Sequence, residues 1–75
     1  MESNDRELII KVGSSNDELR RLYEEHVELN GMIDRLEGMA YLTQQEQIEV
    51  KRLKSIKLRG MRRMMDLVAP YRIEN

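Results

Sequence analysis

Hydrophobic residues recur at alternating steps of three and four through residues 19–36. This heptad spacing continues over nearly three repeats and predicts a helix that packs lengthwise against another helix. The run "SSND" at residues 14–17 favours a helix start, with Asp17 and Glu18 suited to the positive end of the helix dipole. Gly38 suits the position just after a helix end. We therefore predict a helix over about residues 16–37. Its seam, which includes one histidine, consists of Leu19, Leu22, His26, Leu29, Ile33 and Leu36.

A second helix is predicted over about residues 44–68. Thr43 and Glu46 match a capping box, in which each side chain accepts a hydrogen bond from a backbone N–H at the helix start. No proline follows before Pro70. At about 100° per residue, one broad face of this helix is hydrophobic. That face carries Val50, Leu53, Met61, Met64, Met65 and Val68.

The turn between these helices, residues 38–43, is short, so the two helices are expected to be antiparallel neighbours. The predicted fold class is all-α: an antiparallel two-helix hairpin of the coiled-coil type. Residues 1–15 form an N-terminal leader, and residues 69–75 form a C-terminal tail. The leader segment 8–12 suits either a strand or a short helix. A short helix is favoured, because no partner strand is evident.

The size and composition of the chain exclude several classes of protein. Its 75 residues are 36% charged and 4% aromatic, and none is a cysteine. This leaves little material for the walls of a catalytic pocket, and it excludes a disulfide or thiolate metal site. No apolar run approaches the roughly 18 residues of a membrane span, and the N-terminus lacks the basic region of a signal peptide. We expect a cytoplasmic protein with no cofactor, no metal and no membrane attachment.

Charge is distributed unequally between the two predicted helices. Residues 16–37 include seven acidic and three basic side chains, whereas residues 44–68 include seven basic and three acidic ones. The favoured interpretation is that exposed pairs attract the two helices to each other, each contributing about 0.2–0.5 kcal/mol. The alternative is that the basic helix binds nucleic acid or another acidic surface. The residues of this alternative are Lys51, Arg52, Arg59, Arg62 and Arg63.

His26 is the polar member of the first seam, and Lys57 projects into the hydrophobic face of the second helix. Because the chain reverses near residues 40–42, the two side chains are predicted to lie in one layer. A polar layer lowers stability slightly but disfavours shifted registers and wrong partners. We therefore predict that His26 and Lys57 set the register. A catalytic or metal-binding role for His26 is disfavoured, because the chain has no second histidine and no cysteine.

Two helices of this length bury little apolar surface on their own. We therefore expect a non-enzymatic module that self-associates, with a dimer favoured, or that binds a protein partner. Methionine side chains suit such a surface because they are flexible and adapt to different neighbours. The residues proposed for this surface are Met61, Met64, Met65 and Tyr41, although core filling is the favoured role of the three methionines.

The segment "LYEEHVELNGMIDRLEG" resembles the core of the YdcH-like proteins, a family of small bacterial helical hairpins. The likeness covers roughly residues 6–68 and implies a hairpin preceded by a short helix, in a cytoplasmic bacterial setting. It implies no activity and no catalytic residue. The motif His-x-x-Leu-Asp/Asn-x-x-Ile is matched by His26, Leu29, Asn30 and Ile33, and the motif Lys-x-x-Lys-Leu by Lys54, Lys57 and Leu58.

The chain departs from the family pattern after the second motif. The family continues toward Leu-Lys-Asp, whereas this chain has Gly60, Met61 and Arg62. Replacing the aspartate by an arginine removes a salt-bridge partner, and Gly60 reduces side-chain packing. The contacts implied by the resemblance are therefore in doubt at the C-terminal end of the second helix.

Overall fold

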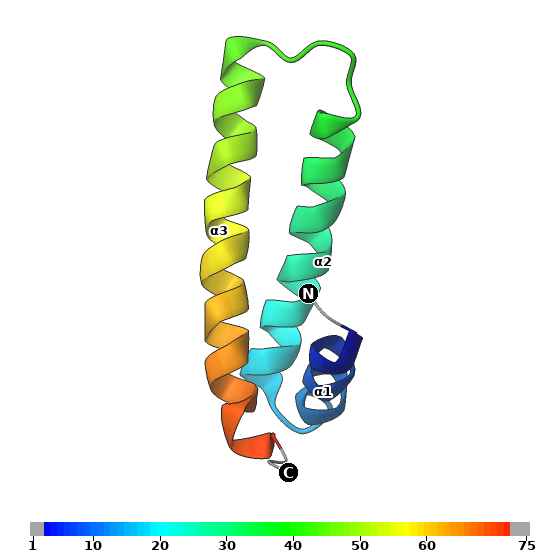
Figure 1. Cartoon of the computed structure of the whole chain (residues 1–75), viewed down its shortest axis with the longest axis vertical. Coiled ribbons are helices and arrows are strands. Elements are labelled where there is room, and N and C mark those ends of the chain that lie inside the picture. The colour runs from blue at the N-terminus through cyan, green and yellow to red at the C-terminus, as the bar shows by residue number, and fades with distance from the viewer. Residues whose placement is uncertain (1–2, 73–75) are drawn as a thin grey trace.

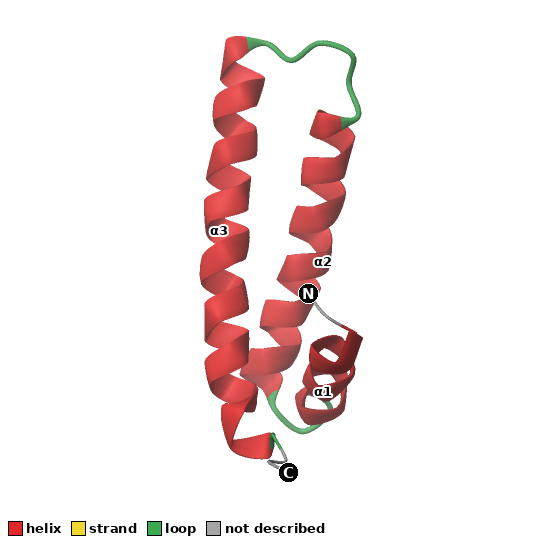
Figure 2. Cartoon of the chain, viewed as in Figure 1, coloured by secondary structure: helices red, strands yellow, loops and turns green. Residues whose placement is uncertain are grey.

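The computed structural model describes residues 3–72, and over this range it consists of helices and loops (Figures 1 and 2). Helix α1 spans Ser3–Gly13, α2 spans Asp17–Glu37, α3 spans Gln44–Val68, and the 3₁₀ turn η1 spans Ala69–Tyr71. The predicted all-helical class is confirmed. The ends of the predicted leader and tail, residues 1–2 and 73–75, lie outside the described range.

A two-helix hairpin is an incomplete description of this fold, because α1 is a third packed helix. Helices α2 and α3 lie side by side and run in opposite directions, joined by the loop 38–43 (Figure 1). Helix α1 folds back beside the lower half of α2, near the C-terminal end of α3 (Figure 1). The predicted leader is thus part of the packed structure rather than a flanking segment.

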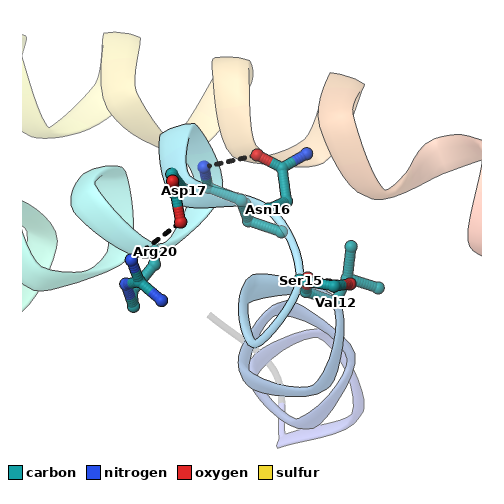
Figure 3. A network of polar contacts seen from close by, with 6 residues as sticks. Val12, Ser15, Asn16, Asp17 and Arg20 are labelled. Carbon is teal, nitrogen blue, oxygen red and sulfur yellow. Dashed lines mark hydrogen bonds and ion pairs between the residues drawn. The ribbon is translucent and has the colours of Figure 1, made fainter.

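Side-chain caps fix the starts of both long helices. Asn16 has an extended backbone, and its Oδ1 accepts a hydrogen bond from the Leu19 N–H at 3.1 Å, so it precedes α2 as the N-cap (Figure 3). Thr43 and Glu46 form both hydrogen bonds of the predicted capping box at the start of α3. Such caps satisfy backbone N–H groups that have no partner within the helix.

The connection between α1 and α2 is a compact turn made by short polar side chains. The Ser15 hydroxyl donates to the Val12 carbonyl at 3.3 Å, and Asp17 pairs with Arg20 at 2.8 Å in the first turn of α2 (Figure 3). Gly13 is buried where α1 approaches the Arg20 backbone. This turn reverses the chain, which brings the apolar side of α1 onto α2 and α3.

The core is unevenly distributed along the molecule. At the end where three helices meet, residues from all three form one buried cluster: Ile9, Val12, Leu19, Met64 and Val68. Toward the loop 38–43 only α2 and α3 remain, and the buried apolar residues there are Ile33, Val50 and Leu53. The packing of α1 therefore supplies a large part of the hydrophobic core, because three elements can enclose a side chain that two leave partly exposed.

Ion pairs also link the elements. Glu18 pairs with Arg63 at 3.0 Å and Glu37 with Lys54 at 2.7 Å, each joining the acidic α2 to the basic α3. The pairing of Arg63 lowers the pKa of Glu18 from its ordinary value. These side chains are about half exposed, so each pair adds little stability but fits the predicted attraction between the two helices.

The packing of α1 predicts that alanine substitutions at two adjacent isoleucines change the free energy of unfolding by very different amounts. Ile9 is fully buried and Ile10 is 53% exposed. Replacing Ile9 by alanine should lower the free energy of unfolding by about 2–5 kcal/mol, because it leaves a cavity among three helices. Ile10→Ala, which makes the same change in helix propensity, should change it by less than about 0.5 kcal/mol. Urea denaturation followed by circular dichroism measures both, and equal effects would show that α1 does not pack in solution.

Candidate functional site

His26 lies in the middle of α2 with 7% of its surface exposed, and it is the buried polar residue of the described core. Its Nε2 lies 3.3 Å from the Asn30 Nδ2, one helical turn further along α2. Its Nδ1 is buried and has no hydrogen-bond partner within residues 3–72. A buried polar nitrogen without a partner is uncommon and costs stability, so this side chain marks a site that packing alone does not explain.

A pocket of about 260 Å³ opens beside His26 at the junction of the three helices. Helix α1 contributes Arg6 and α3 contributes Lys57 to its wall. The remaining wall comes from α2, whose lining residues are Tyr23, His26, Val27 and Asn30. The Tyr23 ring stacks on the imidazole with a centroid distance of 6.4 Å and an interplanar angle of 24°, which holds the histidine against the pocket.

The pKa of His26 is lowered from its ordinary value. Burial is the larger cause, because it removes water from the charged imidazolium, and the nearby Lys57 ammonium is the second, because it repels a second positive charge. His26 and Lys57 both line this pocket. Their role in setting the register stays a prediction.

The predicted seam residues divide into two groups. Five are buried, namely Leu19, His26, Ile33, Val50 and Leu53. The other three, Leu22, Leu29 and Leu36, are partly buried. Each of these three lies three residues after a buried residue of α2, and we call those buried residues the buried line. Three residues turn an α-helix by about 300°, so the three leucines form a row about 60° around the helix from the buried line. The seam is therefore wider than the surface that α3 covers.

The predicted partner surface needs one correction. Met64 is fully buried in the three-helix cluster, which fits the favoured core-filling role and does not fit the alternative of a partner surface. Met61 and Met65 are partly buried against the same cluster. Tyr41, in the loop 38–43, is 91% exposed, so it is the member of this set that solvent reaches freely.

The five basic residues of the alternative interpretation all project onto the outer side of α3, opposite its buried residues. Two of them are ion-paired: Arg52 with Glu49, and Arg63 with Glu18. These pairs raise the pKa of both guanidinium groups. Lys51, Arg59 and Arg62 are exposed and make no ion pair with another described residue. Within residues 3–72, the outer side of α3 thus keeps three cations outside any ion pair, here called the three free cations.

Sequence reasoning found His26 and Lys57 but missed the rest of the pocket. The spacing of Tyr23 and Asn30, three residues before and four after His26, was a usable signal, because such residues neighbour each other on a helix. Arg6 had no comparable signal. Its position depends on the turn that folds α1 back along α2.

The described range also bears on metal binding and on membrane insertion. Within residues 3–72, no group of three or more histidine or carboxylate side chains is arranged to hold a metal ion. No helix there combines the length and apolar character needed to cross a membrane.

The lowered pKa of His26 predicts a pH-dependent stability. In the unfolded chain the imidazole has its ordinary pKa, near 6.5, whereas in the folded protein the pKa is lower. As the pH falls through this window, the unfolded state binds the proton first, so stability present at about pH 7.5 declines toward about pH 5.5.

Urea denaturation of the wild type and of His26→Gln, at both pH values, measures this contribution. The glutamine variant should lose less stability than the wild type on acidification. An equal loss in both proteins would mean that His26 titrates alike in the folded and unfolded states.

Comparison with known proteins places the chain in a family. The sequence model of a family described as "Protein of unknown function (DUF465)" matches residues 19–60, which is more than half of the chain. The match confirms the likeness to small helical proteins of unknown function and ends at Gly60, where the sequence departs from the YdcH-like pattern. Curated proteins and solved structures gave no match. The chain therefore belongs to the DUF465 family of proteins of unknown function.

Proposed function

We propose that this protein is a non-enzymatic interaction module that self-associates through one side of its α2–α3 pair. The observation that carries the proposal is an apolar surface, which we name the open side. It lies on the side of each long helix that is reached three residues beyond the buried residues, and on α2 it extends to Met32, three residues beyond Leu29. Its members are Leu22, Leu29, Met32 and Leu36 on α2, with Ile56, Gly60 and Leu67 on α3.

The geometry of α2 and α3 supports a single continuous open side. In facing antiparallel helices, residues three positions after the buried line lie on one side of the contact, and residues four positions after it lie on the other. Glu37 and Lys54 each lie four positions after a buried residue, and they pair with each other on that side of the contact. The pocket with Arg6 of α1 lies on the same side. The open side is therefore opposite α1, and no described element covers it.

The exposed area of the chain supports the same proposal. The chain exposes 5912 Å² and has a radius of gyration of 14.5 Å. A compact monomer of 9.0 kDa exposes about 4900 Å², and a compact chain of this length has a radius near 11 Å. The excess of about 1000 Å² is comparable to the roughly 800 Å² that each partner buries in a standard interface.

A second copy is the partner that best fits the open side. Two α2–α3 pairs packed by these surfaces would form a four-helix bundle, an arrangement that encloses a seam two helices leave half exposed. In that bundle the acidic α2 of one copy would lie beside the basic α3 of the other, which favours association between two copies of low net charge.

A non-enzymatic role fits the chemistry of the pocket. Its described lining contains no carboxylate and no serine or threonine hydroxyl, so His26 has neither a nucleophile to activate nor an acid to orient it. The buried imidazole is better explained as part of the packing or of a binding site.

Substitutions on the two sides of α2 test self-association. Met32, on the open side, is 38% exposed, and Val27, on the side of α1, is 52% exposed, so glutamate at either position should leave the monomer folded. The wild type should sediment as a dimer, and Met32→Glu should weaken dimerisation at least tenfold because it buries a charge in the interface. Val27→Glu should dimerise like the wild type. A wild type that stays monomeric at several hundred micromolar would contradict the proposal.

Nucleic-acid binding remains the second candidate, favoured by the three free cations on the outer side of α3. Fluorescence anisotropy with a labelled 20-nucleotide DNA at about 50 and 200 mM salt separates the two functions. On the leading proposal no saturable binding is expected. Saturable binding that weakens with salt and is lost in the double variant Arg59→Gln/Arg62→Gln would establish the second candidate instead.

A further inference from the structure

We propose that the pocket around His26 binds a phosphate group, either free or carried by a small phosphate monoester. The pocket lies on the side of α2 that α1 covers, so this inference does not rest on self-association through the open side. It rests on three observations: converging cations from separate helices, hydrogen-bond donors on three sides, and a volume suited to a small oxyanion.

The pocket gathers positive charge without compensating negative charge. Arg6 reaches it from α1 and Lys57 from α3, and its described lining includes no aspartate or glutamate. Neither cation makes an ion pair with another residue of the range 3–72. Elsewhere α2 and α3 place acidic and basic side chains against each other, as at Glu18 and Arg63. Two unpaired cations beside a histidine are stabilised by an anion between them.

Hydrogen-bond donors surround the pocket on three sides. A guanidinium group can donate two parallel hydrogen bonds to an oxyanion, and an ammonium group can donate a further one from a different direction. Asn30 and His26 line the α2 wall. The His26 Nδ1 is covered by packing and lacks a partner, so the donors that face the pocket are those of Arg6, Lys57 and Asn30. Several donors from different directions suit a tetrahedral oxyanion with four acceptor atoms.

The shape of the pocket limits the size of the ligand. Its volume of about 260 Å³ equals that of eight or nine water molecules in the liquid. This is smaller than most pockets for drug-sized ligands, which hold about 300–1,000 Å³. A phosphate group with a few ordered waters, or a small monoester whose carbon chain contacts Tyr23 and Val27, fits this space.

Phosphate binding and His26 protonation should be coupled. In the free protein, burial and the Lys57 ammonium both lower the pKa of His26. A bound phosphate dianion offsets the charge of Lys57 and favours the imidazolium form, so it should raise the pKa of His26. By linkage, protonation of His26 should strengthen phosphate binding by the same factor.

The sole histidine of the chain makes this coupling directly measurable. The His26 ring resonances are followed by NMR over a pH titration of the full chain, with 20 mM inorganic phosphate, with 20 mM glycerol 3-phosphate, and with sodium chloride at matched ionic strength. Phosphate should raise the pKa of His26 by roughly one unit, as a nearby opposite charge does elsewhere, and should shift the Asn30 amide resonances. Chloride should cause neither change, because it acts mainly by screening.

The two phosphate arms identify the source of the group. Tighter binding of glycerol 3-phosphate than of inorganic phosphate would assign the pocket to a monoester, and the reverse would assign it to the free ion. Equal changes in the phosphate and chloride arms, or no change in any arm, would overturn the proposal.

Matched variants separate binding from general charge effects. Lys57→Met and Arg6→Gln should each weaken phosphate binding at least fivefold. Lys11→Met and Arg21→Gln remove the same charges from exposed positions on α1 and α2 outside the pocket and should bind phosphate like the wild type. Far-UV circular dichroism checks that all four variants fold. Equal weakening in the pocket variants and the controls would show that phosphate responds to net charge alone, which would also overturn the proposal.

Discussion

The lengthwise contact between α2 and α3 is the interaction on which the rest of the structure depends. Leu19, Ile33, Val50 and Leu53 are buried because these two helices lie against each other, and the short loop 38–43 keeps them antiparallel. A pair of helices can cover only one line of side chains on each member. The leucines three positions after that line stay partly exposed, and the proposed self-association follows from this uncovered surface.

The fold covers one side of the α2–α3 pair and leaves the other open. On the covered side, the turn at Asn16 directs α1 along α2, so that Ile9 and Val12 complete a core with Met64 and Val68. Further along the same side, where the apolar face of α1 ends, Arg6 meets Lys57 and the buried His26. The covered side therefore contains both the best-packed part of the molecule and its cationic pocket. The open side contains neither and offers apolar surface to another chain.

The sequence was sufficient to predict what depends on neighbouring residues. Thr43 and Glu46 specify the start of α3 by themselves, because a capping box involves four consecutive residues. The heptad spacing predicted which side of each long helix is buried, and the loop length predicted that His26 and Lys57 lie near each other. These features are local, or follow from the geometry of one hairpin.

Features that depend on the placement of α1 were not predictable in the same way. Heptad spacing from Val50 and Lys57 places Met64 on the buried line of α3, but its complete burial also involves the cluster that it forms with Ile9 and Val12 of α1. Arg6 similarly gains a neighbour in Lys57 through the reversal at residues 14–16. Hydrophobic periodicity indicates that residues of α1 can be buried, but it does not indicate which helix they pack against. The three-helix end and the pocket therefore become visible only in the folded chain.

The matched family segment gives a physical reason to treat the two ends of the molecule separately. Residues 19–60 contain α2 almost entirely and the first two thirds of α3, so they include the seam, His26, Asn30 and Lys57. They exclude α1 and the part of α3 that carries Met64 and Val68. The matched segment by itself can form the α2–α3 contact with its polar layer, but the buried cluster that fixes α1 needs residues outside it. Arg6 also comes from outside, so the pocket acquires its second cation only when the three-helix end has folded. In this chain the stability of the α1 packing therefore determines how much positive charge faces His26.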